Sequence, residues 1–528
     1  MYDFIHSASP NSPPKNVSSM IRKPIFLPGS LYSLGIFVIT ATCFSVISAT
    51  ISPTIASANE TRPNVLFIIS DDLNNSIGCY DHELVQTPNI DRLARRGVRF
   101  ERAYCQYPLC GPSRNSMLTG LYPNSTGIHQ NSQIFRQTIP SHHSLSQAFR
   151  LDGYFAARVG KLYHYNVPKS VGTNGHDDPG SWELELNPAG CDRLLEEPDI
   201  FSLRKNSFGG TLSWYASPRG DKLHTDGMLA DDACWVLERC AKRRDRPFFL
   251  ALGFYRPHTP YVAPQPYFEK YDLSQMPLVA NVDEDVKDLP KAALGSHKKD
   301  HELLTDPLRQ QAIQAYFASI TFMDAQVGRV LDQLESLGLA DNTIIVFTSD
   351  HGYHLGEHGL WQKMSLFEES SRVPMIVSAP GMAQGKVAET PVGLIDLYPT
   401  LTQLCGVKSP ENLQGQSLVP ILKDPTHTGR GWTLTQVKRG GKKGFFGYTV
   451  RTPRWRYTEW DEGKAGRELY DHDNDPTEQN NLAESSAHAA TVKELSALIH
   501  KALPQTFPAD GETPALSDKV WAPNLTNP

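Results

Sequence analysis

The stretch "NVLFIISDD" (residues 64–72) joins an apolar run to two adjacent carboxylates, Asp71 and Asp72. A continuous apolar run is typical of a strand that is covered on both faces of a sheet. The chain repeats such runs at residues 154–159, 247–255, 343–349 and 374–379. Because the runs alternate with helical patterns, the sequence predicts an α/β fold with a mostly parallel sheet sandwiched by helices.

Helix signals lie between these strands. Residues 87–97 place Pro88 in a first turn and a glycine at the end, which are start and stop signals of a helix. A longer helical pattern covers residues 308–338. Residues 165–240 and 262–307 fit neither period, and we expect them to be insertions around a binding face.

The pattern changes after Cys405. Four short strands with turn residues between them are expected from "WTLTQVK" (432–438), "FFGYTVRT" (445–452), "WRYTEW" (455–460) and "RELYD" (467–471). A helical pattern near residues 484–502 follows. We therefore expect a larger domain over residues 59–405 and a smaller one over 406–528, built from an antiparallel sheet and a helix.

Residues 1–58 have the features of a secretory signal peptide. Arg22 and Lys23 precede an apolar run at residues 31–49, and "ASA" (56–58) offers a cleavage site. This predicts an exported protein with no stable membrane insertion after cleavage. An uncleaved membrane anchor is the alternative, because the apolar run approaches the length that spans a bilayer.

The composition limits the possible partners. The chain has 528 residues, 40% hydrophobic and 20% charged, with a formal net charge of −6. This balance is that of an ordinary globular protein and argues against a nucleic-acid partner bound through bulk charge. Eight cysteines occur, and removal of Cys43 with the signal peptide leaves an odd number.

Polar side chains follow two of the expected strands. Asp71 and Asp72 end the first, and Asp350 and His351 come directly after "TIIVFTS" (343–349). Ligands of parallel α/β sheets bind beyond the carboxyl ends of the strands. The two sets together predict a site for a hard divalent cation. One such pair alone is better explained as the cap of a turn or a helix, and the presence of both sets in this fold class reverses that preference.

Cys110 stands in "CGPSR" (110–114), where a loop is expected to become a helix. The unpaired N–H groups and the dipole of a helix N-terminus favour a negative charge at that point. A thiol there is open to four interpretations: half of a disulfide, a nucleophile of lowered pKa, a metal ligand, or the precursor of another group.

The motif Cys-x-Pro-Ser-Arg, followed by "LTG" (118–120), resembles the signature of the formylglycine-dependent sulfatases. The resemblance covers residues 60 to about 482, and its wording is closest to the iduronate-2-sulfatase branch. Its further segments are "VGKLYH" (159–164), "FFLALGFYRPHTPY" (248–261), "TSDHGYHLGEHGLWQKMSLFEESSRVPMI" (348–376) and "ELYDHDNDPTEQNNLA" (468–483). It implies an alkaline-phosphatase-like fold.

The resemblance also implies a modified residue and a metal. Cys110 would be oxidised by a formylglycine-generating maturation enzyme, and one hydroxyl of the hydrated aldehyde would attack sulfur while the other later expels sulfate. The implied ligands of one divalent cation, by family habit Ca²⁺, are Asp71, Asp72, residue 110, Asp350 and His351. A histidine is a softer ligand than calcium prefers.

Five further residues acquire roles from the resemblance. Arg114 would hold the hydroxyls of residue 110, and Lys161 and Lys363 would bind sulfate oxygens. His164 would be the base on the second hydroxyl, and His258 the acid that protonates the leaving alcohol. The expected reaction is removal of O-sulfate from a sulfated saccharide, with a 2-sulfated uronic acid as the first candidate substrate.

Other interpretations stay open at this point. The same chemistry fits an arylsulfatase or a choline-sulfatase-like enzyme, and the wider superfamily includes phosphate and phosphonate ester hydrolases. A carbohydrate-binding protein on an inactive scaffold would be expected to lack Cys110, Arg114 or a metal residue. The resemblance places "HQNSQIFR" (129–136) and Tyr353 where the iduronate-2-sulfatase branch contacts the sugar. Trp182, Trp214 and Tyr215 are explained equally well as sugar platforms or as core.

Two patterns imitate metal sites. "HLGEH" (354–358) lacks the glutamate of a zinc helix and is interpreted as a loop at the pocket rim. "DHDND" (471–475) has a proline where a calcium loop needs glycine, and is interpreted as a turn.

Overall fold

The computed structural model describes residues 62–441 and 443–517. The expected signal peptide, residues 1–58, lies outside these described residues. In the described part of the chain, no helix is both long enough and apolar enough to cross a membrane.

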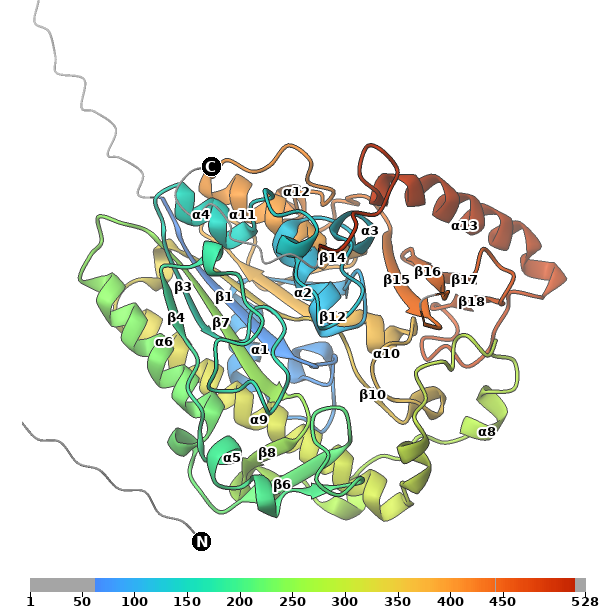
Figure 1. The fold of residues 1–528 in the computed structure, drawn as a ribbon, viewed down its shortest axis with the longest axis horizontal. Helices are drawn as coiled ribbons and strands as arrows, with labels where there is room; N and C mark the ends of the chain where they lie inside the picture. The colour runs from blue at the N-terminus through green and yellow to red at the C-terminus, as the bar shows by residue number, and fades with distance from the viewer. Residues whose placement is uncertain (1–61, 442, 518–528) are drawn as a thin grey trace, which may run out of the picture. The chain divides into compact units, whose positions relative to one another are not determined.

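A nine-stranded sheet forms the centre of the fold (Figure 1). Its order is β13-β2-β12-β9-β1-β7-β3-β4, with β14 also paired to β2. β1 lies in the middle, and β12 is the one strand of this sheet that runs against its neighbours. The bounds are β1 Asn64–Asp71, β2 Val98–Tyr104, β3 Phe155–Gly160, β4 Leu184–Leu186, β7 Phe248–Pro257, β9 Thr343–Ser349, β12 Arg372–Ser378, β13 Lys386–Ala388 and β14 Val392–Gly393. The predicted mostly parallel sheet is confirmed.

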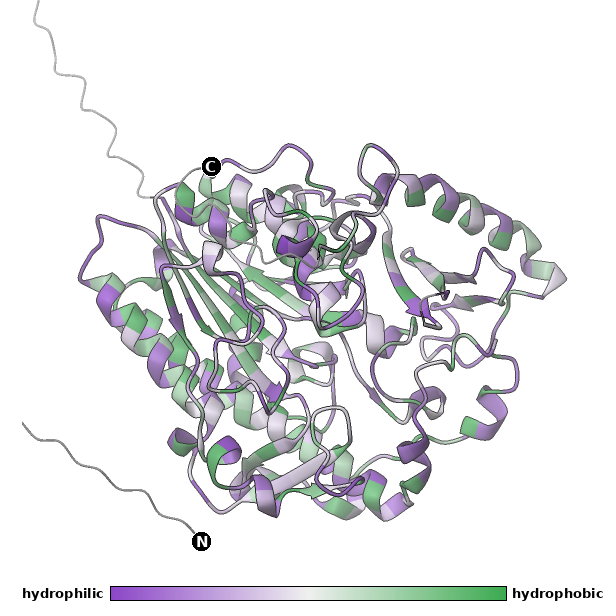
Figure 2. Ribbon diagram, viewed as in Figure 1, coloured by the Kyte–Doolittle hydropathy of each residue, from purple (hydrophilic) through white to green (hydrophobic). Residues whose placement is uncertain are grey.

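Each face of this sheet has its own hydrophobic core. Leu66 and Ile68 of β1 face one core, whereas Val65, Phe67 and Ile69 face the other, as the alternation of side chains along a strand requires. The first core is covered by α1 (Pro88–Arg96), α6 (Thr225–Ala241) and α9 (Asp306–Ser336). The second is covered by α2 (Cys110–Thr119), α4 (Leu145–Leu151), α11 (Leu397–Cys405) and α12 (Val419–Lys423). Figure 2 accordingly shows the strands of this sheet mostly in the hydrophobic colour.

The start and stop signals of the helices are confirmed. α1 begins at Pro88 after the N-cap Thr87 and ends before Gly97, and it buries Ile90, Leu93 and Ala94. α9 matches the long helical pattern expected over 308–338. The strand β2 was not predicted, because the charged residues in "VRFERAY" lack the continuous apolar run of a central strand.

The prediction that residues 165–240 are insertions is wrong in part. β4 belongs to the central sheet, and α6 covers one of its faces. Trp182 is buried in one hydrophobic core and Trp214 in the other. Both are therefore core residues and not sugar platforms. Tyr215 lies in β6 (Ser213–Ser217), which forms a small sheet with β5 (Phe201–Ser202) and β8 (Tyr261–Pro264).

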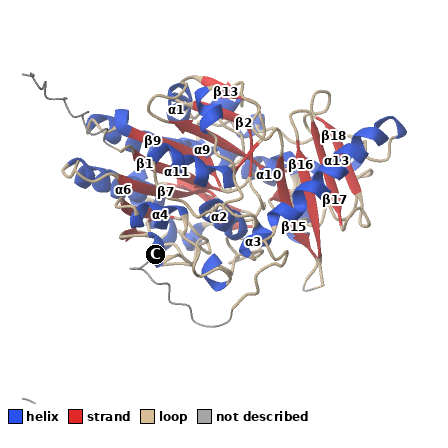
Figure 3. Cartoon of the chain, turned by 90° about the horizontal axis from the view of Figure 1, so that it is seen from above, coloured by secondary structure: helices blue, strands red, loops and turns tan. Residues whose placement is uncertain are grey.

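The smaller antiparallel sheet is also confirmed. Its order is β15-β16-β17-β18, and α13 packs on it (Figure 3). The bounds are β15 Thr433–Arg439, β16 Phe445–Arg451, β17 Trp455–Trp460, β18 Arg467–Asp471 and α13 Ala489–Ala502. The described residues, 62–441 and 443–517, belong to one compact unit, and the division at residue 405 stays a prediction.

Short elements complete the described chain. They are α3 Pro123–Thr126, α5 Cys191–Leu194, α7 Gln265–Phe268, α8 Val282–Asp285, α10 Glu368–Ser371, β10 His354–Leu355 and β11 Trp361–Gln362.

Candidate active site

The predicted carboxylates meet at one edge of the central sheet. Ser70 of β1 pairs with Ser349 of β9, so Asp71 and Asp350 leave adjacent strands at the same level. Asp72 has a φ of 66°, and its backbone N–H donates to Oδ1 of Asp350 over 3.1 Å. Because of this left-handed backbone conformation, the carboxylate of Asp72 lies at the strand ends together with that of Asp71.

Cys110 is the first residue of α2, as expected. Its Sγ lies 3.3 Å from Nε2 of His351, 3.7 Å from Oδ1 of Asp72 and 3.3 Å from Nζ of Lys363. The side chain is fully buried. Gly111 allows a close approach, because a Cβ there would lie 2.9 Å from the Cα of Asn131, whose side chain accepts the Gly111 N–H over 2.8 Å.

Arg114 lies one helical turn after Cys110 and is fully buried. Its Nε donates to Asp350 Oδ2 over 2.8 Å and its Nη2 to Asp71 Oδ1 over 3.0 Å. Nη1 donates to the backbone carbonyls of Lys161, at 2.7 Å, and Leu162, at 3.2 Å. The guanidinium therefore fastens three strand ends together. We expected it to hold the side chain of residue 110, but its donors go to these groups.

The two lysines pair with the two adjacent aspartates. Nζ of Lys161, directly after β3, donates to Asp71 Oδ2 over 2.5 Å. Nζ of Lys363 donates to Asp72 Oδ1. Burial disfavours the lysine charge, but Asp72 and the other nearby anionic groups raise the pKa of Lys363 far above its ordinary value. Both lysine side chains lie close enough to Cys110 to act on its thiol.

The two predicted acid–base histidines lie at the rim of this cluster. Nδ1 of His258 donates to the Thr259 carbonyl over 2.6 Å, which turns Nε2 toward Asp72 Oδ2 at 3.7 Å. His164 has a buried Nδ1 without a hydrogen-bond partner, and it lines a polar cavity of 830 Å³ together with Asn131 and His176. Burial, and then the charge of Lys161, lower the pKa of His164 to about 2. The neutral ring is the form that accepts a proton.

The electrostatics of the cluster favour anions at the carboxylates and at position 110. Burial opposes ionisation of Asp350, yet Arg114 and the nearby cations hold its pKa well below the ordinary value. Burial also opposes a thiolate at Cys110, but Lys161 and Lys363 lower its pKa. An anionic oxygen at this position would be stabilised by the same charges.

The donor set fits a divalent cation. Ligand atoms of Asp72, Cys110, Asp350 and His351 lie within 4.8 Å of one another, and all four residues are buried. Nδ1 of His351 donates to the Gly352 carbonyl over 2.8 Å, so Nε2 faces the carboxylates of Asp72 and Asp350. Burial disfavours the charged ring, but Asp350 and the other anionic groups raise the pKa of His351 to about 9, and a bound cation would replace the Nε2 proton. Asp71 is adjacent and groups with Asp72 and His258, while its own oxygens accept from Arg114 and Lys161.

The structure does not place Tyr353 at a sugar site, and it does not form a zinc site from the histidines of "HLGEH". Tyr353, which the resemblance places at the sugar, is fully buried, and its hydroxyl hydrogen bonds to that of Tyr261 over 2.5 Å. His354 bonds to Ser365 and His358 pairs with Asp285, so the two histidines form no zinc pair. The predicted loop is instead the short strand β10 followed by a 3-10 helix over Glu357–Gly359. "DHDND" is a turn after β18, as predicted.

Sequence reasoning missed Lys298, which lies near Lys363. Its Nζ donates to the Gly210 carbonyl over 2.6 Å and to the side chain of Gln362, the residue before Lys363. Burial, and then the charge of Lys363, lower its pKa to about 8. No motif surrounds Lys298, so its position was visible only after folding.

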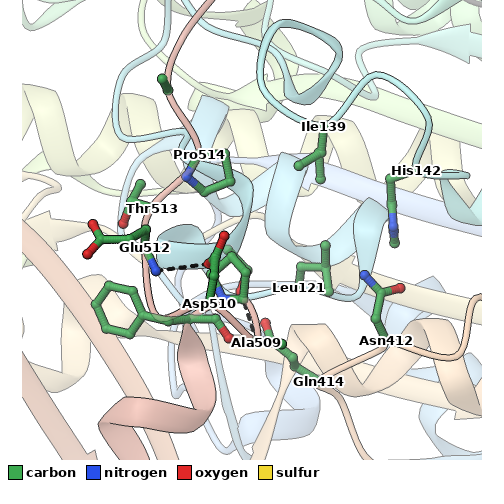
Figure 4. Close-up of a pocket in the computed structure, with 14 residues that line it drawn as sticks. Leu121, Ile139, His142, Asn412, Gln414, Ala509, Asp510, Glu512, Thr513 and Pro514 are labelled. Atoms are coloured by element: carbon green, nitrogen blue, oxygen red, sulfur yellow. Dashed lines mark hydrogen bonds between the residues drawn. The ribbon is translucent and has the colours of Figure 1, made fainter.

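A second cavity, of 680 Å³, lies at the other end of α2 (Figure 4). Leu121, Ile139 and His142 line one side, and Asp510 and Pro514 belong to the C-terminal segment that lines the other. It contains none of the predicted site residues.

The comparisons with known proteins agree with this geometry. The family model described as Sulfatase matches residues 63–407, and one described as N-sulphoglucosamine sulphohydrolase, C-terminal, matches residues 356–505. A sulfatase from Formosa agariphila is 35% identical, with 83% of this chain and 87% of the relative covered. Iduronate 2-sulfatase from Homo sapiens is 30% identical, with 84% and 95% covered. The chain therefore belongs to the sulfatase family, and it is a hydrolase of sulfate esters.

A solved structure supports the fold assignment. The phosphonate monoester hydrolase of Agrobacterium radiobacter superposes with a TM-score of 0.71 at 24% identity, covering 84% of this chain and 96% of its own. This likeness shows the alkaline-phosphatase-like fold.

Proposed function

We propose that this sulfatase removes O-sulfate from an acidic saccharide, with a 2-sulfated uronic acid as the first candidate, through a formylglycine made from Cys110. The observation that carries the chemistry is the position of Cys110, at the head of α2 and 3.3 Å from both His351 Nε2 and Lys363 Nζ. Because the side chain is fully buried, the maturation enzyme would act before α2 packs into place. The export signal proposed for residues 1–58 fits such processing.

Each side chain has a task in this proposal. A hydrated formylglycine supplies one hydroxyl that bonds to sulfur and a second that later releases sulfate. Lys161 and Lys363 bind sulfate oxygens and neutralise their charge. His258 presents Nε2 to protonate the leaving alcohol, and neutral His164 takes the proton of the second hydroxyl.

The proposed ligands of one divalent cation are Asp71, Asp72, Asp350, His351 and the modified residue 110. Two of the aspartates and His351 lie within ligand distance of one another, which supports this set. Carboxylate oxygens favour Ca²⁺. The cation would supply positive charge beside the sulfate.

Lys298 supports an acidic sugar. It lies beside the proposed sulfate site, yet no carboxylate of the described residues lies within ion-pair distance of it. Two of its three N–H donors are used by Gly210 and Gln362, which leaves one for a ligand. A carboxylate on the sugar ring is an anion that this partly buried cation would bind. The 30% identity to iduronate 2-sulfatase points to the same class of substrate.

The test compares two substrates in wild type and in Lys298→Met. For a 2-sulfated uronic acid disaccharide we expect KM to rise about 10-fold or more, as loss of one charge-assisted hydrogen bond predicts. For an uncharged aryl sulfate we expect KM to stay unchanged. Lys299→Met, at an exposed neighbouring position, is the matched control. An equal effect on both substrates, or a wild-type enzyme that prefers the aryl sulfate, would contradict the acidic-sugar proposal.

The remaining alternatives are separated with wild type alone. Choline sulfate, an aryl sulfate and a matched aryl phosphonate are compared by kcat/KM with the uronic acid disaccharide. A preference for choline sulfate would favour the small-ester alternative. A preference for the phosphonate would favour the phosphonate-hydrolase alternative.

A further inference from the structure

Three side chains of different chemistry converge outside the catalytic cluster. They are Cys191 at the start of α5, Glu196 just after that helix, and His224 at the N-cap of α6. A thiol sulfur, a carboxylate oxygen and a ring nitrogen from them lie within 4.8 Å of one another. The exposed fractions are 5%, 1% and 1%. None of these residues belongs to the proposed mechanism.

Two polar atoms of this cluster lack partners. Oε1 of Glu196 accepts from Ser217 Oγ over 2.6 Å and from Arg219 Nη1 over 3.2 Å, whereas Oε2 has no N–H or O–H partner and the Cys191 thiol is the remaining donor beside the carboxylate. Nε2 of His224 has no hydrogen-bond partner either, and it lies 3.7 Å from that Oε2. This separation is too long for a hydrogen bond. Buried polar atoms without partners are costly, so their persistence here needs an explanation.

The histidine is oriented as a metal ligand. Its Nδ1 lies 3.1 Å from the Gly220 carbonyl, which accepts the Nδ1 proton. The lone pair of Nε2 then faces Glu196 and Cys191. A backbone carbonyl that fixes the tautomer in this way commonly supports a metal-binding histidine. Ser217 and Arg219 similarly orient the Glu196 carboxylate, because both donate to its Oε1.

The separation of the atoms fits a small cation. Bonds of about 2.0–2.3 Å to nitrogen, oxygen and sulfur, arranged tetrahedrally, put ligand atoms roughly 3.3–3.6 Å apart. The observed 3.7 Å between Nε2 and Oε2 is close to this spacing. A set of one thiolate, one imidazole and one carboxylate suits a borderline-soft ion such as Zn²⁺ better than Ca²⁺.

We propose that Cys191, Glu196 and His224 bind a second divalent cation of the Zn²⁺ class, separate from the catalytic one, with water as the fourth ligand. The three side chains bring together the segment around α5 and the start of α6.

The site adjoins the residues that hold the His258 loop. Asp192, next to Cys191, accepts from the Thr225 N–H over 2.8 Å and from Arg256 Nη2 over 2.7 Å. Arg256 stands two residues before His258 and donates through Nε to the Val262 carbonyl over 2.7 Å. A cation at Cys191 and His224 would therefore hold in place the Asp192–Arg256 contact that positions the loop of His258, the proposed catalytic acid.

The first test uses the full chain carrying Cys110→Ala, which removes the thiol of the catalytic cluster. Purified protein is stripped of weakly held Ca²⁺ and its metal content is measured by mass spectrometry after exposure to Zn²⁺. We expect about one tightly held zinc ion per chain, as for a site with three protein ligands. Zinc that is lost completely on dialysis would overturn the proposal.

The second test identifies the ligand. Co²⁺ in place of Zn²⁺ gives a near-ultraviolet charge-transfer band when a thiolate is bound. We expect this band in the Cys110→Ala protein and its loss after the further change Cys191→Ser, with Cys240→Ser as the matched control at another buried free cysteine. Bound Co²⁺ without the band, or a band that survives Cys191→Ser, would contradict the assignment. Absence of the band from the Cys110→Ala protein overturns the proposal even if the Cys191 variant fails to fold.

Discussion

At the scale of single residues, Arg114 connects the groups on which the site depends. Its guanidinium contacts the carboxylates of Asp71 and Asp350 and two carbonyls at the end of β3. Asp71 and Asp350 are fully buried, so removal of this cation would leave both carboxylates with fewer buried counter-charges. Because the guanidinium is a planar fork with five donors, a lysine cannot reproduce the set of contacts.

We predict that Arg114→Lys lowers kcat at least 100-fold, of the order expected when catalytic groups are displaced by about 1 Å. The free energy of unfolding should fall by about 3 kcal/mol, from two lost charge-assisted hydrogen bonds. Sulfate release and urea unfolding measure the two effects. Arg95→Lys, at an exposed position of α1, is the control and should change neither. Wild-type turnover in the Arg114 variant would contradict the positioning role.

At the residue scale, local motifs identified side chains that lie close together in the fold, and the roles assigned to them stay predictions. Cys110, Arg114, Lys161, Lys363 and His258 are brought together as the resemblance implied. Lys298 and the cluster of Cys191, Glu196 and His224 could not be foreseen, because their segments carry no period and their partners come from distant parts of the chain. The same limit applies to Tyr353, which motif order placed at the sugar and which the fold buries.

At the scale of elements, the close contact between β3 and β7 positions Lys161. Gly160 pairs with Gly253 in this register, and the Lys161 N–H donates to the Gly253 carbonyl over 2.9 Å. A Cβ at Gly253 would lie 1.9 Å from the Lys161 carbonyl oxygen, which itself accepts from Arg114. The absence of a side chain at Gly253 is therefore required for the end of β3 to reach the site.

We predict that Gly253→Ala displaces Lys161 and lowers the free energy of unfolding by about 1–3 kcal/mol, as overpacking does. kcat for sulfate ester hydrolysis should fall as well. Both are measured beside Gly220→Ala, where a Cβ meets nothing within 4 Å and φ is −81°. Wild-type kcat in Gly253→Ala would show that Lys161 does not depend on a glycine at this position.

Prediction at the element scale worked for strands with long apolar runs and for capped helices. β9 (Thr343–Ser349) and β17 (Trp455–Trp460) have the bounds that the sequence indicated. β2 was missed because it lies outside β12, toward the edge of the sheet, and tolerates charged residues. α6 was missed because most of it lies within residues 165–240, which fit neither the strand period nor the helix period clearly.

At the scale of the whole molecule, the C-terminal sheet supports the loop that carries Lys363. Arg456 of β17 is buried; it pairs with Glu368 and Glu478 and donates to the Leu366 carbonyl over 3.0 Å. Tyr107, Leu360 and Leu366 share a hydrophobic core with Val437 and Trp460 of the same small sheet. The two expected domains thus meet through a shared core and a buried ionic network.

We predict that Arg456→Met lowers the free energy of unfolding by about 3–5 kcal/mol, because it leaves buried carboxylates without their cation. Activity should fall too, although this residue lies far along the chain from Cys110. Thermal unfolding and turnover are compared with Arg454→Met, whose half-exposed side chain pairs with Asp471. Unchanged stability in the Arg456 variant would contradict a supporting role for this sheet.

The large-scale architecture followed from the sequence because strand and helix periods differ clearly in both parts of the chain. The dependence of one part on the other did not, because Arg456, Glu368 and Glu478 form a network only in three dimensions.

The proposed function depends on Cys110 as the precursor of a formylglycine that acts on sulfate esters. The most direct measurement is the mass of the tryptic peptide from Ala103 to Arg114, taken from active protein exported by a host with the maturation enzyme. We predict that residue 110 is present as the aldehyde or its hydrate, and that this fraction rises and falls with sulfatase activity across preparations. An intact thiol at residue 110 in protein that nevertheless hydrolyses sulfate esters would contradict the claim.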